Sequence, residues 1–182
     1  DIGALGSLEG LESLFLDRNL LRDLRPLNGL ANLRELGISL NQVSDLTPLS
    51  HLMKLERLVA NNNRISNLEP LASNLALTEL HISNNGVTDL TELAHLTNLE
   101  VLNLSSNEIS DLGPLTALTR LRQLNLSSND ITDLSPLLAN AGIGEETVIT
   151  LAGNPLSDLA SNFQIGVLRQ RGVDIFYESP LQ

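Results

Sequence analysis

An asparagine recurs every 22 residues through most of the chain, and this spacing constrains the fold more than any other feature of the sequence. The repeated residues are Asn19, Asn41, Asn63, Asn85, Asn107 and Asn129, and a further copy, Asn154, follows after 25 residues. A fixed period of this length indicates one structural unit stacked upon itself. We therefore expect a solenoid.

Each unit opens with three leucines spaced as Leu121, Leu124 and Leu126. The last two flank a polar residue, which is the period-two pattern of a half-buried strand. Parallel strands about 4.8 Å apart would stack into one sheet. The asparagine then marks the turn out of the strand. Its amide both donates and accepts, so we expect it to satisfy backbone groups and to pair with the asparagine of the next turn.

A return segment such as Asp-Leu-Thr-Pro-Leu leads from each strand to the next. Thr47-Pro48, Gly113-Pro114 and Ser135-Pro136 predict helix starts, with a capping residue followed by proline at the first helical position. About six residues remain, enough for a 3-10 turn or a single helical turn. In one unit Asn74 stands where leucine is expected, and we expect Leu75 to compensate by a local shift.

The pattern L-x-x-L-x-L-x-x-N resembles the leucine-rich repeat family. The 22-residue length and the Asp-Leu-x-Pro-Leu segment are similar to the short class found in bacterial internalins and in a regulatory subunit of type-one protein phosphatase. The resemblance covers nearly the whole chain. It implies an α/β fold: a right-handed solenoid with a curved parallel β-sheet on the concave side and short 3-10 or α turns on the convex side.

The frame divides the chain into four parts. Residues 1–10 match the second half of a repeat and predict a partial, uncapped first repeat, as in a piece of a longer protein. Residues 11–145 hold six 22-residue repeats, with a three-residue loop insertion after the sixth. Residues 146–177 form the last repeat and a C-terminal cap, and residues 178–182 form a tail.

Both ends carry further expectations. Ile2, Leu5 and Leu8 would leave an apolar edge that associates end to end or frays. At the other end Ser157 would cap a helix that Gly172 stops, followed by a final strand over 173–176. The helix residues expected to face the core are Leu159, Phe163, Val167 and Leu168.

Composition narrows the function. Eleven Lys and Arg against 22 Asp and Glu give a net charge of −11, which disfavours nucleic acid and anionic membrane as partners. No apolar run approaches the ~18 residues of a membrane span, so no membrane insertion is expected. The absence of cysteine excludes disulfides and thiolate chemistry and leaves the compartment open.

The sequence shows no catalytic set, so we expect no enzyme, cofactor or metal site. His51 and His95 occupy equivalent positions two units apart, roughly 10 Å, which is too far to share a metal ion, and His81 faces outward from a strand. No G-x-S-x-G motif or phosphate-binding glycine loop is present. The recurring aspartates could gather calcium or bond backbone amides in their own turns, and the second alternative is favoured. These aspartates are Asp23, Asp45, Asp89, Asp111, Asp133 and Asp158, with Asn67 replacing one.

The outward strand positions are the best candidates for a binding site, because they would line the concave face. In the first four units they include an aromatic residue, two apolar residues and charges of both signs, which resembles an interface centre with its rim. The alternative is neutral variation of surface residues. The candidates are Phe15, Arg18, Glu35, Leu40, Arg57, Val59, Glu79 and His81. The next two units repeat Asn-Leu-Ser-Ser-Asn, which suits a solvated sheet without a partner.

Resemblance to internalins implies a protein-binding module of a larger bacterial secreted or surface protein, with a protein partner on the concave face. Resemblance to the phosphatase subunit implies the alternative, an intracellular regulatory scaffold. A secreted or surface location is slightly favoured.

Overall fold

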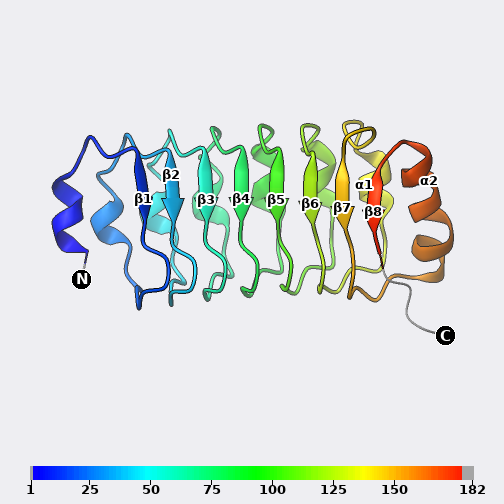
Figure 1. Ribbon diagram of the computed structural model, residues 1–182, viewed down its shortest axis with the longest axis horizontal. Coiled ribbons are helices and arrows are strands. Elements are labelled where there is room, and N and C mark those ends of the chain that lie inside the picture. Colours follow the sequence, from blue (N-terminus) through cyan, green and yellow to red (C-terminus); the bar gives the residue numbers. More distant parts are fainter. Residues whose placement is uncertain (1, 178–182) are drawn as a thin grey trace.

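The chain forms one row of eight short parallel strands that follow each other in sequence order. The computed structural model describes residues 2–177. The strands are β1 Ser13–Phe15, β2 Glu35–Gly37, β3 Arg57–Val59, β4 Glu79–His81, β5 Val101–Asn103, β6 Gln123–Asn125, β7 Val148–Thr150 and β8 Asp174–Phe176. Each strand descends at the front of the molecule and the chain returns behind it, which makes the solenoid right-handed (Figure 1).

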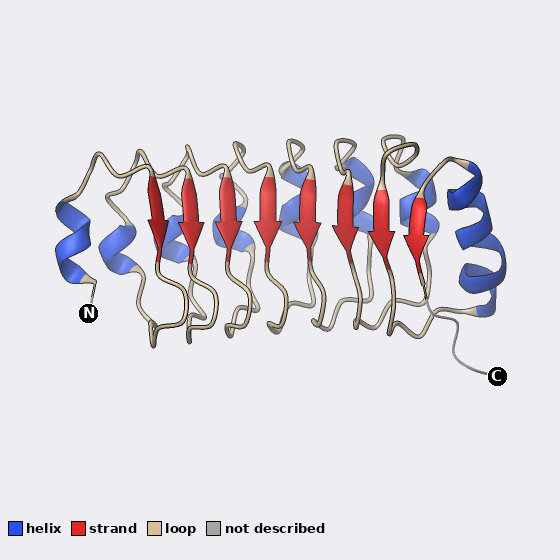
Figure 2. Ribbon diagram, viewed as in Figure 1, coloured by secondary structure: helices blue, strands red, loops and turns tan. Residues whose placement is uncertain are grey.

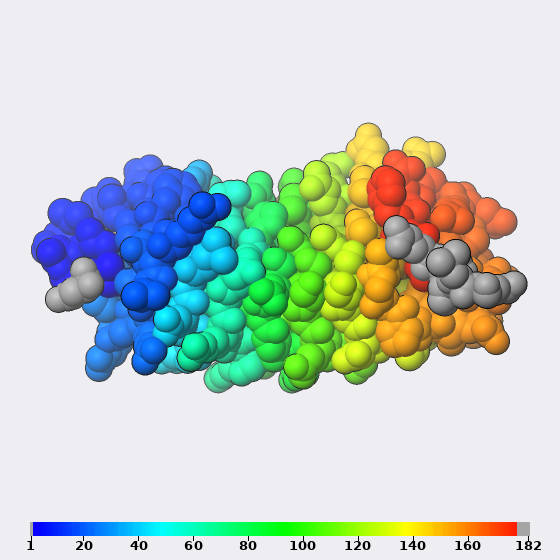
Figure 3. All heavy atoms as spheres, turned by 60° about the horizontal axis from the view of Figure 1, so that its bottom comes forward, coloured from blue at the N-terminus to red at the C-terminus, as the bar shows by residue number. Residues whose placement is uncertain are grey.

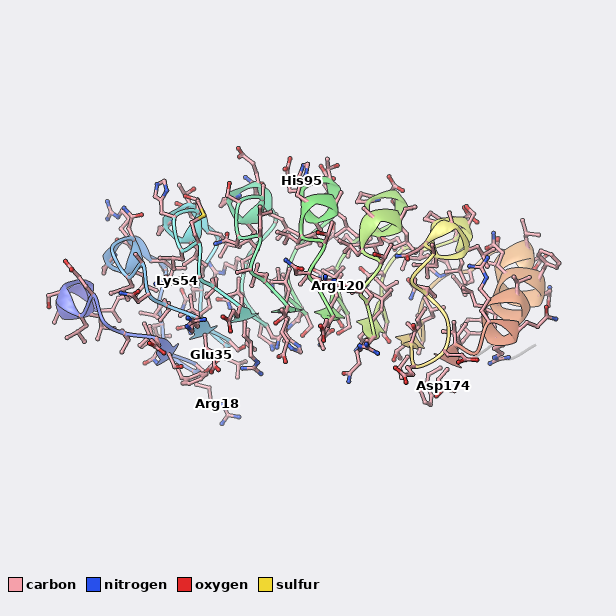
Figure 4. All side chains as sticks on the ribbon, turned by 90° about the horizontal axis from the view of Figure 1, so that it is seen from above. Arg18, Glu35, Lys54, His95, Arg120 and Asp174 are labelled. Carbon is pink, nitrogen blue, oxygen red and sulfur yellow. The ribbon has the colours of Figure 1, made fainter. Side chains whose placement is uncertain are left out.

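Short helices occupy the return segments and form a second row behind the sheet (Figure 2). Their bounds are η1 Gly3–Ser7, η2 Arg25–Leu27, η3 Thr47–Leu49, η4 Glu69–Leu71, η5 Thr91–His95, η6 Gly113–Ala117 and α1 Ser135–Ala139. Seen from above, the helices follow an arch and the strands lie on its inner side, so the sheet is concave (Figure 4). The expected fold class is therefore confirmed. None of the helices within residues 2–177 is long and apolar enough to cross a membrane.

The core is a stack of leucines in register. Leu36 pairs with Leu58 and Leu58 with Leu80 along the sheet, each in the middle of a three-residue strand and at most 1% exposed. Burying each such side chain contributes about 1.5–3 kcal/mol. In the space-filling view the chain colours succeed one another along the long axis, as expected when each coil packs mainly on its neighbours (Figure 3).

From Asn41 onward, the repeated asparagines bind the backbone of the preceding coil, whereas Asn19 binds only its own coil. Asn41 Nδ2 donates to the Leu16 carbonyl (2.9 Å), and Asn41 Oδ1 accepts from the Leu21 amide (2.9 Å). The same links recur as far as Asn154. The predicted pairing between successive asparagines is wrong, because each amide group is already engaged by main-chain groups of two coils.

The aspartates cap the return segments. Asp45 Oδ1 accepts from the Thr47 amide at 2.8 Å, and Asn67 does the same for Glu69 at 2.9 Å. Hydrogen bonds from Thr47 hold the pKa of Asp45 below its usual value. The expectation that these side chains bond backbone amides is confirmed for Asn67 and for every aspartate except Asp158, whose carboxylate accepts no backbone amide within residues 2–177. The prediction that Thr47 is the capping residue of η3 is wrong, because the N-cap position is Leu46 and the side-chain acceptor is Asp45.

Two coils replace an inward leucine by asparagine. Asn74 is fully buried and its Nδ2 donates to two carbonyls of the preceding coil, but its Oδ1 has no hydrogen-bond partner within residues 2–177. The predicted compensation by Leu75 is wrong, since that side chain is 54% exposed. Asn140 makes the same two donations, and its Oδ1 also accepts from the Gly142 amide at 2.8 Å.

The N-terminal coil presents an apolar edge. Leu8 is 47% exposed and Leu20 81%, while Leu11, Leu14 and Leu16 are only partly buried. The exposure expected for Leu8 is thus present, and end-to-end association stays a prediction.

The C-terminal cap begins as predicted and then turns differently. Ser157 Oγ accepts from the Ala160 amide at 3.2 Å, and the helix continues as a π-turn, η7 Ala160–Gln164, and α2 Ile165–Gln170. The extra residue in the π-turn rotates the side chains that precede it relative to those that follow. As a result Leu159 and Phe163 are each 61% exposed, which contradicts their predicted inward placement.

Gln164 takes an inward place in this cap, together with Ala160, Ile165 and Leu168. Its Oε1 accepts from the Leu134 amide (2.8 Å), and its Nε2 donates to the Asp133 carboxylate (2.7 Å). Gly172 ends the helix at a φ of 86°, as its type predicts. The predicted tail, 178–182, lies outside the described residues.

Candidate functional site

Two columns of side chains stand on the concave face, one on each side of the inward leucines. The leading column holds the first residue of every strand: Ser13, Glu35, Arg57, Glu79, Val101, Gln123, Val148 and Asp174. The trailing column holds the third: Phe15, Gly37, Val59, His81, Asn103, Asn125, Thr150 and Phe176. Parallel pairing in register sets neighbours in a column one strand spacing apart, about 4.8 Å.

Phe15 leans across the neighbouring strand because Gly37 leaves it room. A Cβ at position 37 would stand 2.8 Å from Phe15 Cδ1 and 2.8 Å from an oxygen of Asp17. The Asp17 carboxylate is itself fixed, since it accepts from the Ser39 amide at 2.7 Å. The ring therefore covers Gly37, which is buried, while remaining 58% exposed to solvent.

An ion pair joins the neighbouring strands β3 and β4 on this face. Arg57 Nε lies 2.6 Å from Glu79 Oε2, and both side chains are a little under two-fifths exposed. His81 Nε2 lies 3.7 Å from the same carboxylate oxygen. Burial, and secondly the charge of Arg57, lower the pKa of His81 below its usual value of 6.5. The shift favours the uncharged form of the His81 ring.

The turn after each strand from β1 to β7 contains a residue with a left-handed backbone. Arg18 has φ 58° and Leu40 has φ 57°, and the coils of β3 to β7 repeat this conformation. This left-handed conformation costs roughly 1–2 kcal/mol for most residues, less for asparagine, and almost nothing for glycine. In the view from above, the Arg18 side chain projects from the sheet side into solvent (Figure 4).

A shallow depression of about 360 Å³ lies further along the face, over β4 to β7. The side chains around it include His81, Val101, Asn103, Gln123, Asn125, Val148 and Thr150. His81 is the one member of the eight predicted site residues that lines it. The other predicted residues lie on β1 to β4 and on the turns after β1 and β2.

Two features of this face were not predicted from the sequence. Val101 and Val148 interrupt a polar stretch, and this could have signalled the depression. Phe176 could have been found by extending the strand register, because the inward Ile175 places it in the trailing column, where it is 61% exposed.

The arrangement favours contact and hydrogen bonding with a large partner. Its groups are single apolar side chains, one ion pair and rows of amides and hydroxyls on a sheet held by main-chain hydrogen bonds. Within residues 2–177 no three His, Cys, Asp or Glu side chains are grouped so as to hold a metal ion. His95 lies on the helix row, on the opposite side of the molecule from the concave face (Figure 4).

Comparison with known proteins agrees with this geometry. A family model describing two leucine-rich repeats matches four overlapping segments, which together span more than half of the chain: residues 31–73, 54–95, 75–117 and 97–139. No curated protein sequence matches significantly.

Solved structures resemble the chain over nearly its whole length. Internalin C2 of Listeria monocytogenes is 27% identical with a TM-score of 0.82, and the match covers 96% of this chain and 74% of that one. An internalin F structure from the same species is 29% identical with a TM-score of 0.77, covering 98% and 59%. A leucine-rich-repeat protein of Leptospira interrogans is 27% identical with a TM-score of 0.85, covering 95% and 44%. The chain thus spans less than two thirds of the last two proteins.

Proposed function

The chain belongs to the leucine-rich repeat family, and we propose on that basis that it is a protein-binding module that holds its partner against the concave face. The observation that carries this proposal is the unbroken register of eight strands, which lines up two columns of outward side chains. Exposed Phe15 and Phe176 lie at the two ends of one column. Leucine-rich repeat proteins are typically interaction modules without enzymatic activity, and our proposal includes no catalytic step.

Rigidity is the proposed mechanism of binding. The core leucines and the asparagine bonds between coils fix the strands before a partner arrives, so association orders few groups and loses little entropy. The proposed contact residues are Phe15, Arg18, Glu35, Leu40, Arg57, Val59, Glu79 and His81, whose side chains combine apolar surface with charge.

We further propose that the module is part of a larger bacterial secreted or surface protein. The likeness to internalins at 27% and 29% identity supports this context. The role of the whole protein belongs to the same proposal.

Site-directed cross-linking tests the concave face. The chain contains no cysteine, so single cysteines can be introduced and labelled with a photoreactive maleimide. Val59→Cys and Asn103→Cys place the label on the concave face, and His95→Cys places it on the convex row as the matched control. We expect cross-linked partner from the first two variants. Equal cross-linking from His95→Cys would contradict the proposal.

Substitutions test the individual contacts. Phe15→Ala and Arg57→Glu should weaken binding of the recovered partner, because they remove exposed aromatic area and reverse a charge on the face. Ser105→Ala and Ser127→Ala should leave binding unchanged. Equal effects of the two pairs of substitutions in a binding titration would contradict the assignment of the contact residues to the first four coils.

A further inference from the structure

The left-handed position after each strand carries two kinds of residue. Arg18 and Leu40 have long side chains there. The five later coils have short ones or none: Asn62, Asn84, Ser106, Ser128 and Gly153. Since all seven share the same backbone conformation, the first two coils carry the residues that suit it least.

Neither long side chain belongs to the hydrophobic core or packs against it. Leu40 is 44% exposed, so much of its apolar surface faces water. Arg18 is exposed and takes part in none of the ion pairs among residues 2–177. Strained positions without a structural benefit are concentrated at binding sites.

The two residues belong to one patch with Phe15, which we name the β1–β2 corner (Phe15, Arg18 and Leu40). Arg18 and Leu40 are equivalent residues of adjacent coils, about 4.8 Å apart along the sheet. Phe15 lies three residues before Arg18 and covers Gly37 of the second coil. An arginine beside an exposed aromatic and an exposed leucine is a typical composition of a binding hot spot.

The distribution of charge suggests what the corner can accept. Residues 2–64 contain seven Lys and Arg and seven Asp and Glu, a net charge of zero. Residues 65–119 contain no Lys or Arg and seven Asp and Glu, a net charge of −7. A carboxylate on a partner is therefore repelled by the middle of the solenoid and can be accommodated at the N-terminal coils, where the guanidinium of Arg18 is open to a charge-assisted hydrogen bond.

We propose that the β1–β2 corner anchors the partner, and that it takes an extended protein segment presenting a carboxylate next to an apolar side chain. The carboxylate binds Arg18, and the apolar side chain lies against Phe15 and Leu40. The inference rests on the proposed protein-binding function and names the partner chemistry for one end of that face.

Relief of the backbone strain provides a test that separates binding from folding. The full chain is used to select binders from a phage-displayed random peptide library, and the affinity of the selected synthetic peptides is measured by fluorescence anisotropy. The test variants are Arg18→Asn and Leu40→Asn, and the matched controls at the same position of later coils are Ser106→Asn and Ser128→Asn.

The expected result combines two opposite changes. The selected peptides should contain Asp or Glu beside Leu, Ile or Phe, and each corner variant should weaken their binding about tenfold or more. The same variants should melt about 2–4 °C higher, because asparagine tolerates the left-handed backbone. The controls should bind as the parent chain does.

Other outcomes overturn the inference in distinguishable ways. If binding is lost in Gln123→Ala or Val148→Ala and kept in the corner variants, the concave face binds protein but the anchor lies at the β4–β7 depression. If no peptide is selected, or if binding is insensitive to all of these variants, the corner and the concave-face function both fail. A melting temperature lowered by Leu40→Asn would overturn the strain argument.

Discussion

Asn74 is the position where a single substitution should stabilise the solenoid. Its amide oxygen is buried without a hydrogen-bond partner within residues 2–177, and the equivalent positions of the flanking coils hold fully buried Leu52 and Leu96. The backbone is the same in these coils: the main-chain N–H of Asn74 donates to the carbonyl three residues earlier at 2.9 Å, as the main-chain N–H of Leu96 does. Asn74→Leu therefore restores the residue that this coil geometry accepts elsewhere.

Three contributions set the expected change in the free energy of unfolding for Asn74→Leu. An unsatisfied buried polar atom costs about 1–3 kcal/mol, and Asn74→Leu removes it. A buried leucine contributes about 1.5–3 kcal/mol. Against these, two hydrogen bonds of about 0.5–1.5 kcal/mol each are lost. Their acceptors, the Leu49 and Leu52 carbonyls, keep backbone donors at 3.0 Å. We expect a net gain of about 1–2 kcal/mol, or about 2–8 °C in melting temperature.

Asn140→Leu is the matched control with the opposite expectation. Asn140 occupies the equivalent position, but its oxygen accepts from the Gly142 amide, so no unsatisfied atom is removed. The substitution loses three hydrogen bonds and leaves the Gly142 amide unpaired, and these losses exceed the gain from a buried leucine, so the net cost should be about 1–3 kcal/mol. Thermal and urea denaturation followed by circular dichroism measure both variants. Loss of stability in Asn74→Leu, or equal gains in both variants, would refute the reasoning.

Further predictions concern the inserted loop, the caps and the N-terminal edge. Gly142→Ala should cost about 1–3 kcal/mol or more in the free energy of unfolding, because its Cβ would lie 1.9 Å from the Thr119 carbonyl oxygen; Gly144→Ala, with 3.4 Å to its nearest neighbour, should be milder in the same denaturation assay. The pKa of Asp45 is lowered in the folded state. The stability that its carboxylate contributes is therefore fully present above pH 3.8, its ordinary pKa, and is lost as the pH falls through the folded-state pKa. Asp45→Asn should therefore fold normally at pH 7 and show a shallower acid unfolding profile, and an unchanged profile would contradict this. Sedimentation velocity at rising concentration should show self-association that Leu20→Glu abolishes, because Leu20 is 81% exposed at the apolar edge; a strictly monomeric parent chain would exclude it.

The sequence was sufficient to predict the sheet, because one repeat period sets both the register of the strands and the direction of their side chains. Once Leu14, Leu36 and Leu58 are recognised as equivalent, alternation along each strand decides which residues face the core and which face outward on the concave side. The same logic placed Phe15, Val59 and His81 in one column, as the register now shows.

Features that depend on a break in the period could not be predicted in this way. The π-turn at Ala160–Gln164 turned Leu159 and Phe163 outward, and helical spacing alone carries no sign of such a turn. Asn74 was recognised as a departure, but its burial follows from the leucines around it in neighbouring coils. The left-handed backbone at Leu40 was likewise hidden, because leucine is among the residues that least predict it.

The asparagine that ties each coil to the one before it has a consequence for how such a chain can change in length. Every link from Asn41 to Asn129 spans the same sequence distance, so duplicating or excising one whole coil recreates the link at the new junction. The sheet then grows or shortens by about 4.8 Å while the remaining strands keep their partners. The length of the concave face is thus adjustable in fixed steps of one coil, independently of the outward side chains along it.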